Sequence, residues 1–157
     1  MYKRVVKIPK IIFAKIDSGG NLKVGNYHFY FKLADADGNE TDFVGESGLV
    51  SIFVGFDNPK SAHTGNKNEN SYKSVSFLMT DIDSSYDYVT VYYSRNTAEN
   101  NDNSVTEYVK ISKKFIVNKA SEAQIVITGF EESEVITASD INLSYNIVDA
   151  AHTSAVC

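Results

Sequence analysis

The chain has 157 residues, of which 43% are hydrophobic and 22% charged, and its formal net charge is −5. This composition is typical of a globular protein that can bury a core without disulfides or metal, and the single cysteine, Cys157, excludes an internal disulfide. Phosphate binding needs a basic surface, so the acidic balance argues against a dedicated nucleic-acid binder, though not against a protein that encloses DNA without gripping it. The sequence contains no run of about 18 apolar residues, so no membrane-spanning helix is predicted.

Residues 1–55 are predicted to form N-terminal strands and a hairpin. Residues 5–16 are rich in β-branched side chains and contain Pro9, which suits an edge strand or two short strands around a kink. Residues 17–21 have the composition of a turn, and residues 44–54 form a further predicted strand.

The clearest element is a strand with one buried face over residues 22–33. Bulky apolar side chains recur there at every second position, the period of a half-buried strand, and they belong to Tyr27, Phe29, Phe31 and Leu33. Asp37-Gly38 follows and supplies residues that tolerate the positive φ of a short hairpin turn.

Residues 56–71 are predicted to be an exposed polar loop, and loops of that length are often functional. Residues 72–157 carry the remaining predicted strands, at 72–82, 86–95, 105–117, 124–128, from about Val135, and at 143–148. In the first of these, Val75, Phe77 and Met79 share a face. A second polar loop is expected at 96–104, and single helical turns at 118–123 and 139–142.

About eight to ten short strands with turn signals between them predict an all-β antiparallel sandwich. The sequence ends at Cys157 without a polar close, shortly after a predicted strand. We therefore expect a fragment of a longer polypeptide, in which residues 1–55 belong either to the same sandwich as residues 72–157 or to a neighbouring one.

The sequence predicts no catalytic residues. His28, His63 and His152 are scattered, and no G-x-S-x-G nucleophile motif accompanies them. Paired carboxylates can hydrolyse glycosides, but Asp83 and its neighbours Asp81 and Asp87 are better interpreted as a solvated turn.

A group of exposed tyrosines leaves one alternative open. Tyr88, Tyr92 and Tyr93 lie close together in the sequence, and aromatic rings of this kind can stack on sugars. Cross-strand packing is the favoured interpretation, because aromatic residues pack well on half-buried sheets.

The spacing of Asp35, Asp37, Asn39 and Glu46 imitates a calcium-binding loop. Its glycine falls two positions too early, and the flanking segments are predicted strands rather than helices. The favoured interpretation is therefore a turn that uses Asp, Asn and Gly for backbone reasons, and no metal or cofactor is predicted.

Two segments resemble fibronectin type III-like domains. Leu22-x-x-Gly25-x-Tyr27 and the Asp35–Thr41 turn resemble the late strands of that immunoglobulin-like sandwich, while residues 75–95 resemble its B-to-C pair. The resemblance implies that the Tyr27 hydroxyl bonds to the backbone at a corner. Because the late pattern comes first, the chain holds either parts of two sandwiches or one sandwich with swapped strand order.

The stretch from Ile11-Ile12 through Ile16-Asp17-x-Gly19-Gly20-Asn21-Leu22 to Phe31 is similar to a segment of the tail nozzle, or stabilisation, proteins of short-tailed, crAss-like phages of gut bacteria. The resemblance implies a non-enzymatic virion protein that forms a ring at the distal end of the tail. Such a ring retains the packaged genome and docks other tail proteins.

The loops at 56–70 and 96–104 are expected to meet neighbouring subunits or the lumen. Acidic side chains are interpreted either as an ordinary solvated surface or as a DNA-repelling lining; these are Glu99, Asp102, Glu131, Glu132 and Glu134. The alternative function is an adhesion or carbohydrate-binding module.

Overall fold

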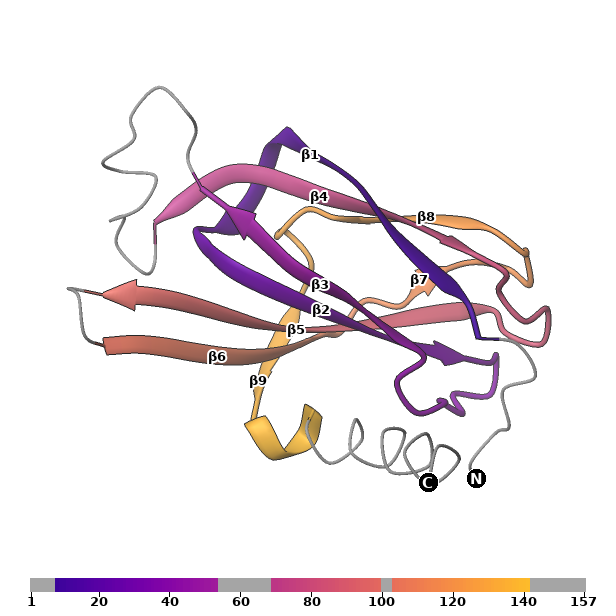
Figure 1. Ribbon diagram of the computed structural model, residues 1–157. Coiled ribbons are helices and arrows are strands. Elements are labelled where there is room, and N and C mark those ends of the chain that lie inside the picture. The colour runs from indigo at the N-terminus through magenta and orange to yellow at the C-terminus, as the bar shows by residue number, and fades with distance from the viewer. Residues whose placement is uncertain (1–7, 54–68, 100–102, 142–157) are drawn as a thin grey trace, which may run out of the picture.

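Two antiparallel sheets packed face to face make up the computed structural model, which describes residues 8–53, 69–99 and 103–141 (Figure 1). The smaller sheet has the order β1-β4-β8 and the larger has the order β3-β2-β5-β6-β9, with β7 paired to β5. The strands are β1 (Lys10–Lys23), β2 (Gly25–Ala34), β3 (Gly45–Ile52), β4 (Asn70–Thr80), β5 (Tyr88–Glu99), β6 (Asn103–Ile111), β7 (Phe115–Ile116), β8 (Ala123–Ile127) and β9 (Ser133–Ile136). The predicted all-β, sandwich-like architecture is confirmed.

The core lies between the sheets and follows the predicted period of two. Every second side chain of β2 is buried, from Tyr27 to Leu33, and the alternate residues are only partly covered. On β4 the predicted face is confirmed, since Val75, Phe77 and Met79 have no exposed surface. The Phe77 ring packs edge-on against Phe29 and Phe31 at centroid distances of 5.2 and 5.4 Å. Burial of a side chain of this size contributes roughly 2–3 kcal/mol.

The first six strands repeat one pattern. β1 lies in the smaller sheet and is followed by the antiparallel pair β2–β3 in the larger sheet; β4 and the pair β5–β6 do the same. The two units meet through the antiparallel pairs β1–β4 and β2–β5. The sandwich is therefore built around an approximate two-fold relation between β1–β3 and β4–β6.

Strands from both sides of the predicted loop at 56–71 pair with one another, because β1 joins β4 and β2 joins β5. The described strands of residues 10–52 thus share both sheets with those that follow. Most of that loop lies outside the described residues, as do the predicted strand at 143–148, His63 and His152.

The prediction of a loop at 96–104 is wrong. β5 continues to Glu99 and β6 begins at Asn103, with ladder pairs from Asn96↔Thr106 to Glu99↔Asn103. Polar residues are tolerated there because the hairpin ladder satisfies the backbone, whatever the composition of the side chains.

Three further predictions need correction. Residues 17–21 do not end a strand: β1 runs through them, and its ladder with β4 shifts between Ser18 and Leu22 as a bulge. The single strand expected at 105–117 is divided into β6 and β7. The helical turn expected at 118–123 is absent from this described segment, since Asn118 and Lys119 have φ values of 51° and 60°, outside the right-handed helical region.

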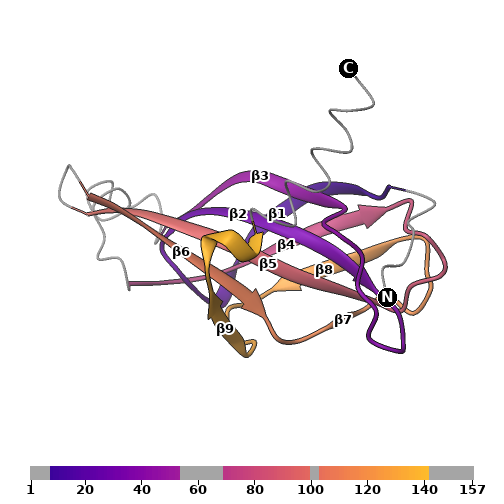
Figure 2. The same ribbon diagram turned by 90° about the horizontal axis from the view of Figure 1, so that it is seen from below.

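A helical turn at residues 138–141 confirms most of the one predicted at 139–142, although Asn142 lies outside the described residues. It lies over the outer face of the larger sheet, where Ile141 packs with Phe43 and Tyr92 (Figure 2). Within the described residues no helix has the length and apolar character to span a bilayer.

Candidate functional site

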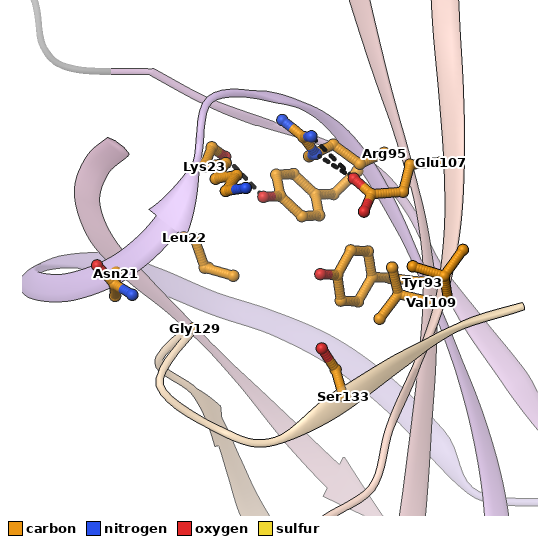
Figure 3. A pocket seen from close by; sticks show the side chains of 11 residues that line it. Asn21, Leu22, Lys23, Tyr93, Arg95, Glu107, Val109, Gly129 and Ser133 are labelled. Atoms are coloured by element: carbon orange, nitrogen blue, oxygen red, sulfur yellow. Dashed lines mark hydrogen bonds and ion pairs between the residues drawn. The ribbon is translucent and has the colours of Figure 1, made fainter. Parts of the chain in front are cut away.

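A hollow of about 180 Å³ opens at the side of the sandwich where β1 turns into β2. Figure 3 shows Asn21, Leu22 and Lys23 of β1 across from Tyr93, Arg95 and Glu107 of β5 and β6. Gly129 of the β8–β9 connection and Ser133, the first residue of β9, close a third side. The hollow therefore brings together segments from both sheets.

Arg95 is the central group of this hollow. Its side chain is only 7% exposed. The Nε and Nη2 atoms donate to Oε2 of Glu107 at 3.1 and 2.8 Å, and Nη1 donates to the carbonyl oxygen of Val24 at 2.9 Å. A Cβ at Gly25 would lie 2.8 Å from Cγ of Arg95, so glycine makes room for the aliphatic part of the Arg95 side chain at the corner. The ion pair lies within the β5–β6 hairpin, and the Arg95–Val24 hydrogen bond joins this hairpin to the β1–β2 corner.

Two tyrosines lie beside Arg95. The Tyr27 hydroxyl donates a 2.6 Å hydrogen bond to the carbonyl oxygen of Lys23, as the resemblance implies for a corner tyrosine. Burial raises the pKa of Tyr27 far above its ordinary value. Burial and the nearby Glu107 carboxylate raise the pKa of Tyr93 to about 12. Both phenols therefore remain protonated at neutral pH.

The β8–β9 connection is held by Glu131, which was expected to be an ordinary surface carboxylate or part of a DNA-repelling lining. Its carboxylate accepts hydrogen bonds from the backbone of Thr128 and Gly129 at 3.0 and 2.9 Å and from the Thr128 hydroxyl at 2.6 Å. Burial alone would raise the pKa of Glu131, but these hydrogen bonds outweigh it and lower the pKa. The Thr128 carbonyl in turn accepts from the Asn21 backbone at 2.6 Å, which fastens the connection to the bulge of β1.

The polar contacts of the hollow hold the fold together, and we call them the structural lock. Arg95 binds Glu107 and Val24, Tyr27 binds Lys23, and Glu131 binds its own turn. These interactions hold segments up to 71 positions apart in the sequence. Sequence reasoning missed Arg95 and Glu107, although Arg95 continues the inward phase of Val89, Val91 and Tyr93.

A second surface of interest is the outer face of the smaller sheet. Three aliphatic side chains there form what we call the outer row, with exposed fractions of 49% for Ile12, 36% for Leu78 and 39% for Val126. Ile12 lies directly opposite Leu78 in the ladder, and Val126 lies opposite Ser76, one diagonal step away. The row thus crosses all three strands and leaves apolar surface open to a partner.

In the possible calcium loop, the Asp35 carboxylate binds its own turn. Oδ1 of Asp35 accepts from the backbone nitrogens of Asp37 and Asn39 at 3.0 and 2.9 Å, and Oδ2 accepts from the Asn39 side chain at 3.2 Å. Gly38 has a φ of 88°, as the predicted turn requires. No cluster of potential metal ligands occurs in the described part of the chain.

The other residues singled out from the sequence do not converge where the structure describes them. His28 lies partly covered on β2. Asp83 is buried and accepts from the backbone of Ser85, whereas Asp81 is exposed. Tyr92 packs on the outer face of the larger sheet against Phe43, while Tyr93 packs on the inner face against Tyr27 and Phe29. Adjacent positions on a strand point to opposite faces, so Tyr92 and Tyr93 do not form one stacking platform.

The comparison with protein families decides the identity. The family model of the Crassvirus muzzle protein matches residues 3–125. The chain belongs to this family. A search of curated proteins found no match.

This muzzle-family chain is a structural protein of the virion and is located in the phage tail, so the predicted relation to crAss-like phage structural proteins is confirmed. The matched residues run from the N-terminal segment into β8. They include Ile12 and Leu78 of the outer row, together with Arg95 and Glu107, whereas Val126 lies just beyond the match.

Proposed function

We propose that this muzzle-family chain is a non-enzymatic sandwich module of the tail nozzle. In this role it assembles into a ring with copies of itself, docks other tail proteins and helps to retain the packaged genome. The observation that carries the proposal is the outer row of Ile12, Leu78 and Val126, which presents apolar side chains to solvent on a virion structural protein. Contiguous apolar surface favours protein interaction, and the outer row is continuous across the three strands of the smaller sheet.

The interior supports a mechanical role. A module that transmits load between neighbours must keep its two sheets in register, and the Arg95–Val24 and Tyr27–Lys23 hydrogen bonds join the larger sheet to the β1–β2 corner, where the chain leaves the smaller sheet. Arg95, Glu107 and Tyr27 of the hollow are engaged in structural contacts, which suits a scaffold rather than a reaction site. Glu132 and Glu134 are exposed and are available to a lining that repels DNA.

We also infer that the sandwich is of the immunoglobulin or fibronectin type III-like kind. In that fold strands B and E pair in one sheet, while C′, C, F and G follow one another in the other. The pair β1–β4 and the order β3-β2-β5-β6 fit this scheme. Because the two units are alike, β1–β3 match either B, C and C′ or E, F and G. The Tyr27–Lys23 hydrogen bond favours the second assignment, since a corner tyrosine marks the E–F turn.

Immunogold electron microscopy of intact phage particles, with antibodies against the recombinant chain, tests the nozzle assignment. We expect label at the distal end of the tail, and partial loss of packaged DNA from particles that lack the protein. Label confined to the portal end, or full genome retention without the protein, would contradict the proposal. Saturable binding to a defined glycan that is lost in Tyr92→Ala would instead support the adhesion alternative.

A further inference from the structure

The smaller sheet is complete on one side of β4 and open on the far side of β1. β8 pairs antiparallel with Val75–Met79 of β4 and covers the core with Ile125 and Ile127, whose exposed fractions are 1% and 0%. Within the described residues no strand pairs with the other edge of β1, which ends the sheet order β1-β4-β8 (Figure 1). An open strand edge presents unpaired backbone donors and acceptors.

The core is uncovered at this edge. Phe13 lies opposite Phe77 and Ile16 lies opposite Val75, so both point toward the interior. Their partners on β4 have no exposed surface, whereas Phe13 and Ile16 are 44% and 37% exposed. The difference arises because β4 has a neighbour on each side and β1 has only one.

The approximate two-fold relation between the units indicates what is missing. Exchange of β1 and β4 about the middle of the part of their ladder that joins Lys10–Ser18 to Lys73–Thr80 brings the stretch that β8 covers, Val75–Met79, onto the part of β1 that contains Phe13 and Ile16. The start of β1 is closed differently, because Ile11 packs against Gly45 of β3, where an added Cβ would lie 2.5 Å from Cδ1 of Ile11. The open slot therefore begins at Phe13.

The charges near this slot do not oppose a partner strand. Edge strands are commonly protected by unpaired lysines, but here Lys15 pairs with Asp17 at 3.4 Å and Lys10 with Asp81 at 3.8 Å. The edge carries one bulge, between Phe13 and Lys15, and a second after Ser18. From Lys15 to Ser18, between these bulges, the strand is regular and locally neutral, and Phe13 directly precedes the first bulge.

We propose that the edge of β1 from Phe13 to Ser18 accepts a β-strand from another polypeptide of the tail. By analogy with β8, the incoming strand runs antiparallel to β1 and presents aliphatic side chains at two alternate positions to cover Phe13 and Ile16. Strand addition of this kind takes its affinity from main-chain hydrogen bonds and its specificity from alternate side chains. The inference deepens the proposed assembly role, but that role would stand on the outer row alone if the slot proved unused.

A peptide with the sequence of residues 121–129, which contains β8, is the probe. We expect saturable binding of the labelled peptide to the full chain by fluorescence anisotropy, and no binding of a scrambled peptide of the same composition. Phe13→Glu or Ile16→Glu should weaken binding about ten-fold or more, because the charge would be buried under the added strand. Leu49→Glu, on the exposed outer face of β3, is the matched control and should bind like the wild type.

Hydrogen exchange on the wild-type chain keeps the test decisive if a variant fails to fold. The peptide should slow amide exchange across residues 13–18 and leave β8 unchanged. Three outcomes would overturn the proposal. The peptide could show no saturable binding, or it could speed exchange in β8 by displacing that strand. The β1 edge could also prove to be protected already, by pairing with β1 of a second copy.

Discussion

The guanidinium of Arg95 donates a 2.9 Å hydrogen bond to the carbonyl oxygen of Val24, which lies 71 positions earlier in the chain. Val24 is the residue between β1 and β2, so this bond fixes the point where the chain passes from the smaller sheet to the larger. Glu107 lies directly opposite Arg95 in the β5–β6 ladder and neutralises its charge from the other side.

Arg95→Ala should therefore destabilise the fold by about 2–4 kcal/mol, because it leaves Glu107 without its partner and the Val24 carbonyl without its donor. Lys15→Ala removes an exposed ion pair with Asp17 and should cost less than about 0.5 kcal/mol. Urea unfolding of both variants gives the comparison, and equal losses would refute a special role for Arg95.

Tyr27→Phe removes only the hydroxyl that binds Lys23, and the expected loss is about 1 kcal/mol in the free energy of unfolding. Tyr72 is 64% exposed, so Tyr72→Phe serves as the control and should lie within about 0.5 kcal/mol of the wild type. If Tyr27→Phe unfolded at the same urea concentration as the control, the corner bond would contribute nothing.

Two glycines with nearly the same φ separate backbone strain from steric contact. Gly38 has a φ of 88°, and a Cβ added there would meet nothing within 4 Å, whereas a Cβ at Gly129, φ 90°, would lie 2.5 Å from the backbone of Asn21 and Leu22. Gly38→Ala should cost about 1 kcal/mol from the left-handed conformation alone, and Gly129→Ala about 3 kcal/mol or more because the backbone must also shift. Thermal unfolding distinguishes the two, and similar melting temperatures would contradict the close packing of the β8–β9 connection on β1.

Alkaline pH should weaken the fold. The pKa of Tyr93 is raised to about 12, and burial raises the pKa values of Tyr27 and Tyr92 as well. The folded state thus holds phenol protons that the unfolded state releases near its ordinary pKa of about 10, so stability is full below that pH and falls as the pH rises above it. Burial lowers the pKa of Lys32, so this lysine favours the folded state as the pH rises. It is one group against the three tyrosines, and the net effect is a loss of stability.

The urea midpoint should therefore decline between about pH 10 and pH 12, and Tyr93→Phe should show a shallower decline. A midpoint that is constant over this range in the wild type, or a slope unchanged by Tyr93→Phe, would argue against buried phenols.

Ser76→Ala should be neutral or stabilising. The Ser76 Oγ is buried and makes no hydrogen bond to any described residue, so removing it relieves a desolvated polar group, by up to about 1 kcal/mol. Ser71→Ala is the contrasting variant, since the Ser71 hydroxyl donates to the carbonyl of Leu22. Differential scanning calorimetry should give a higher melting temperature for the first than for the second, and the reverse order would contradict the assigned contacts.

The strands of this sandwich were predictable where the period of two was strong. Tyr27 to Leu33 and Val75 to Met79 combine bulky residues with strict alternation, so their buried faces follow from the sequence. The polar residues 96–99 gave no such signal, and only the hairpin ladder with β6 makes them strand.

The contacts of the structural lock could not be predicted from the sequence, for a different reason. The alternation of Val89, Val91 and Tyr93 extends to Arg95 and predicts an inward arginine, but its partners depend on register and topology. Glu107 is opposite only because β5 and β6 pair in this register, and Val24 is near only because β2 pairs with β5. Non-local pairing of this kind is not encoded in any local window of the sequence.

The central claim is that the chain assembles in the tail through the smaller sheet, and hydroxyl-radical footprinting of intact particles tests it most directly. Oxidation rates at Ile12, Leu78 and Val126 would be measured in the virion and in the free chain. We predict several-fold slower oxidation of the outer row in the virion, because a docked neighbour excludes solvent from buried interface residues. Equal rates in the two states would show that the outer row is free in the assembled tail and would contradict the account.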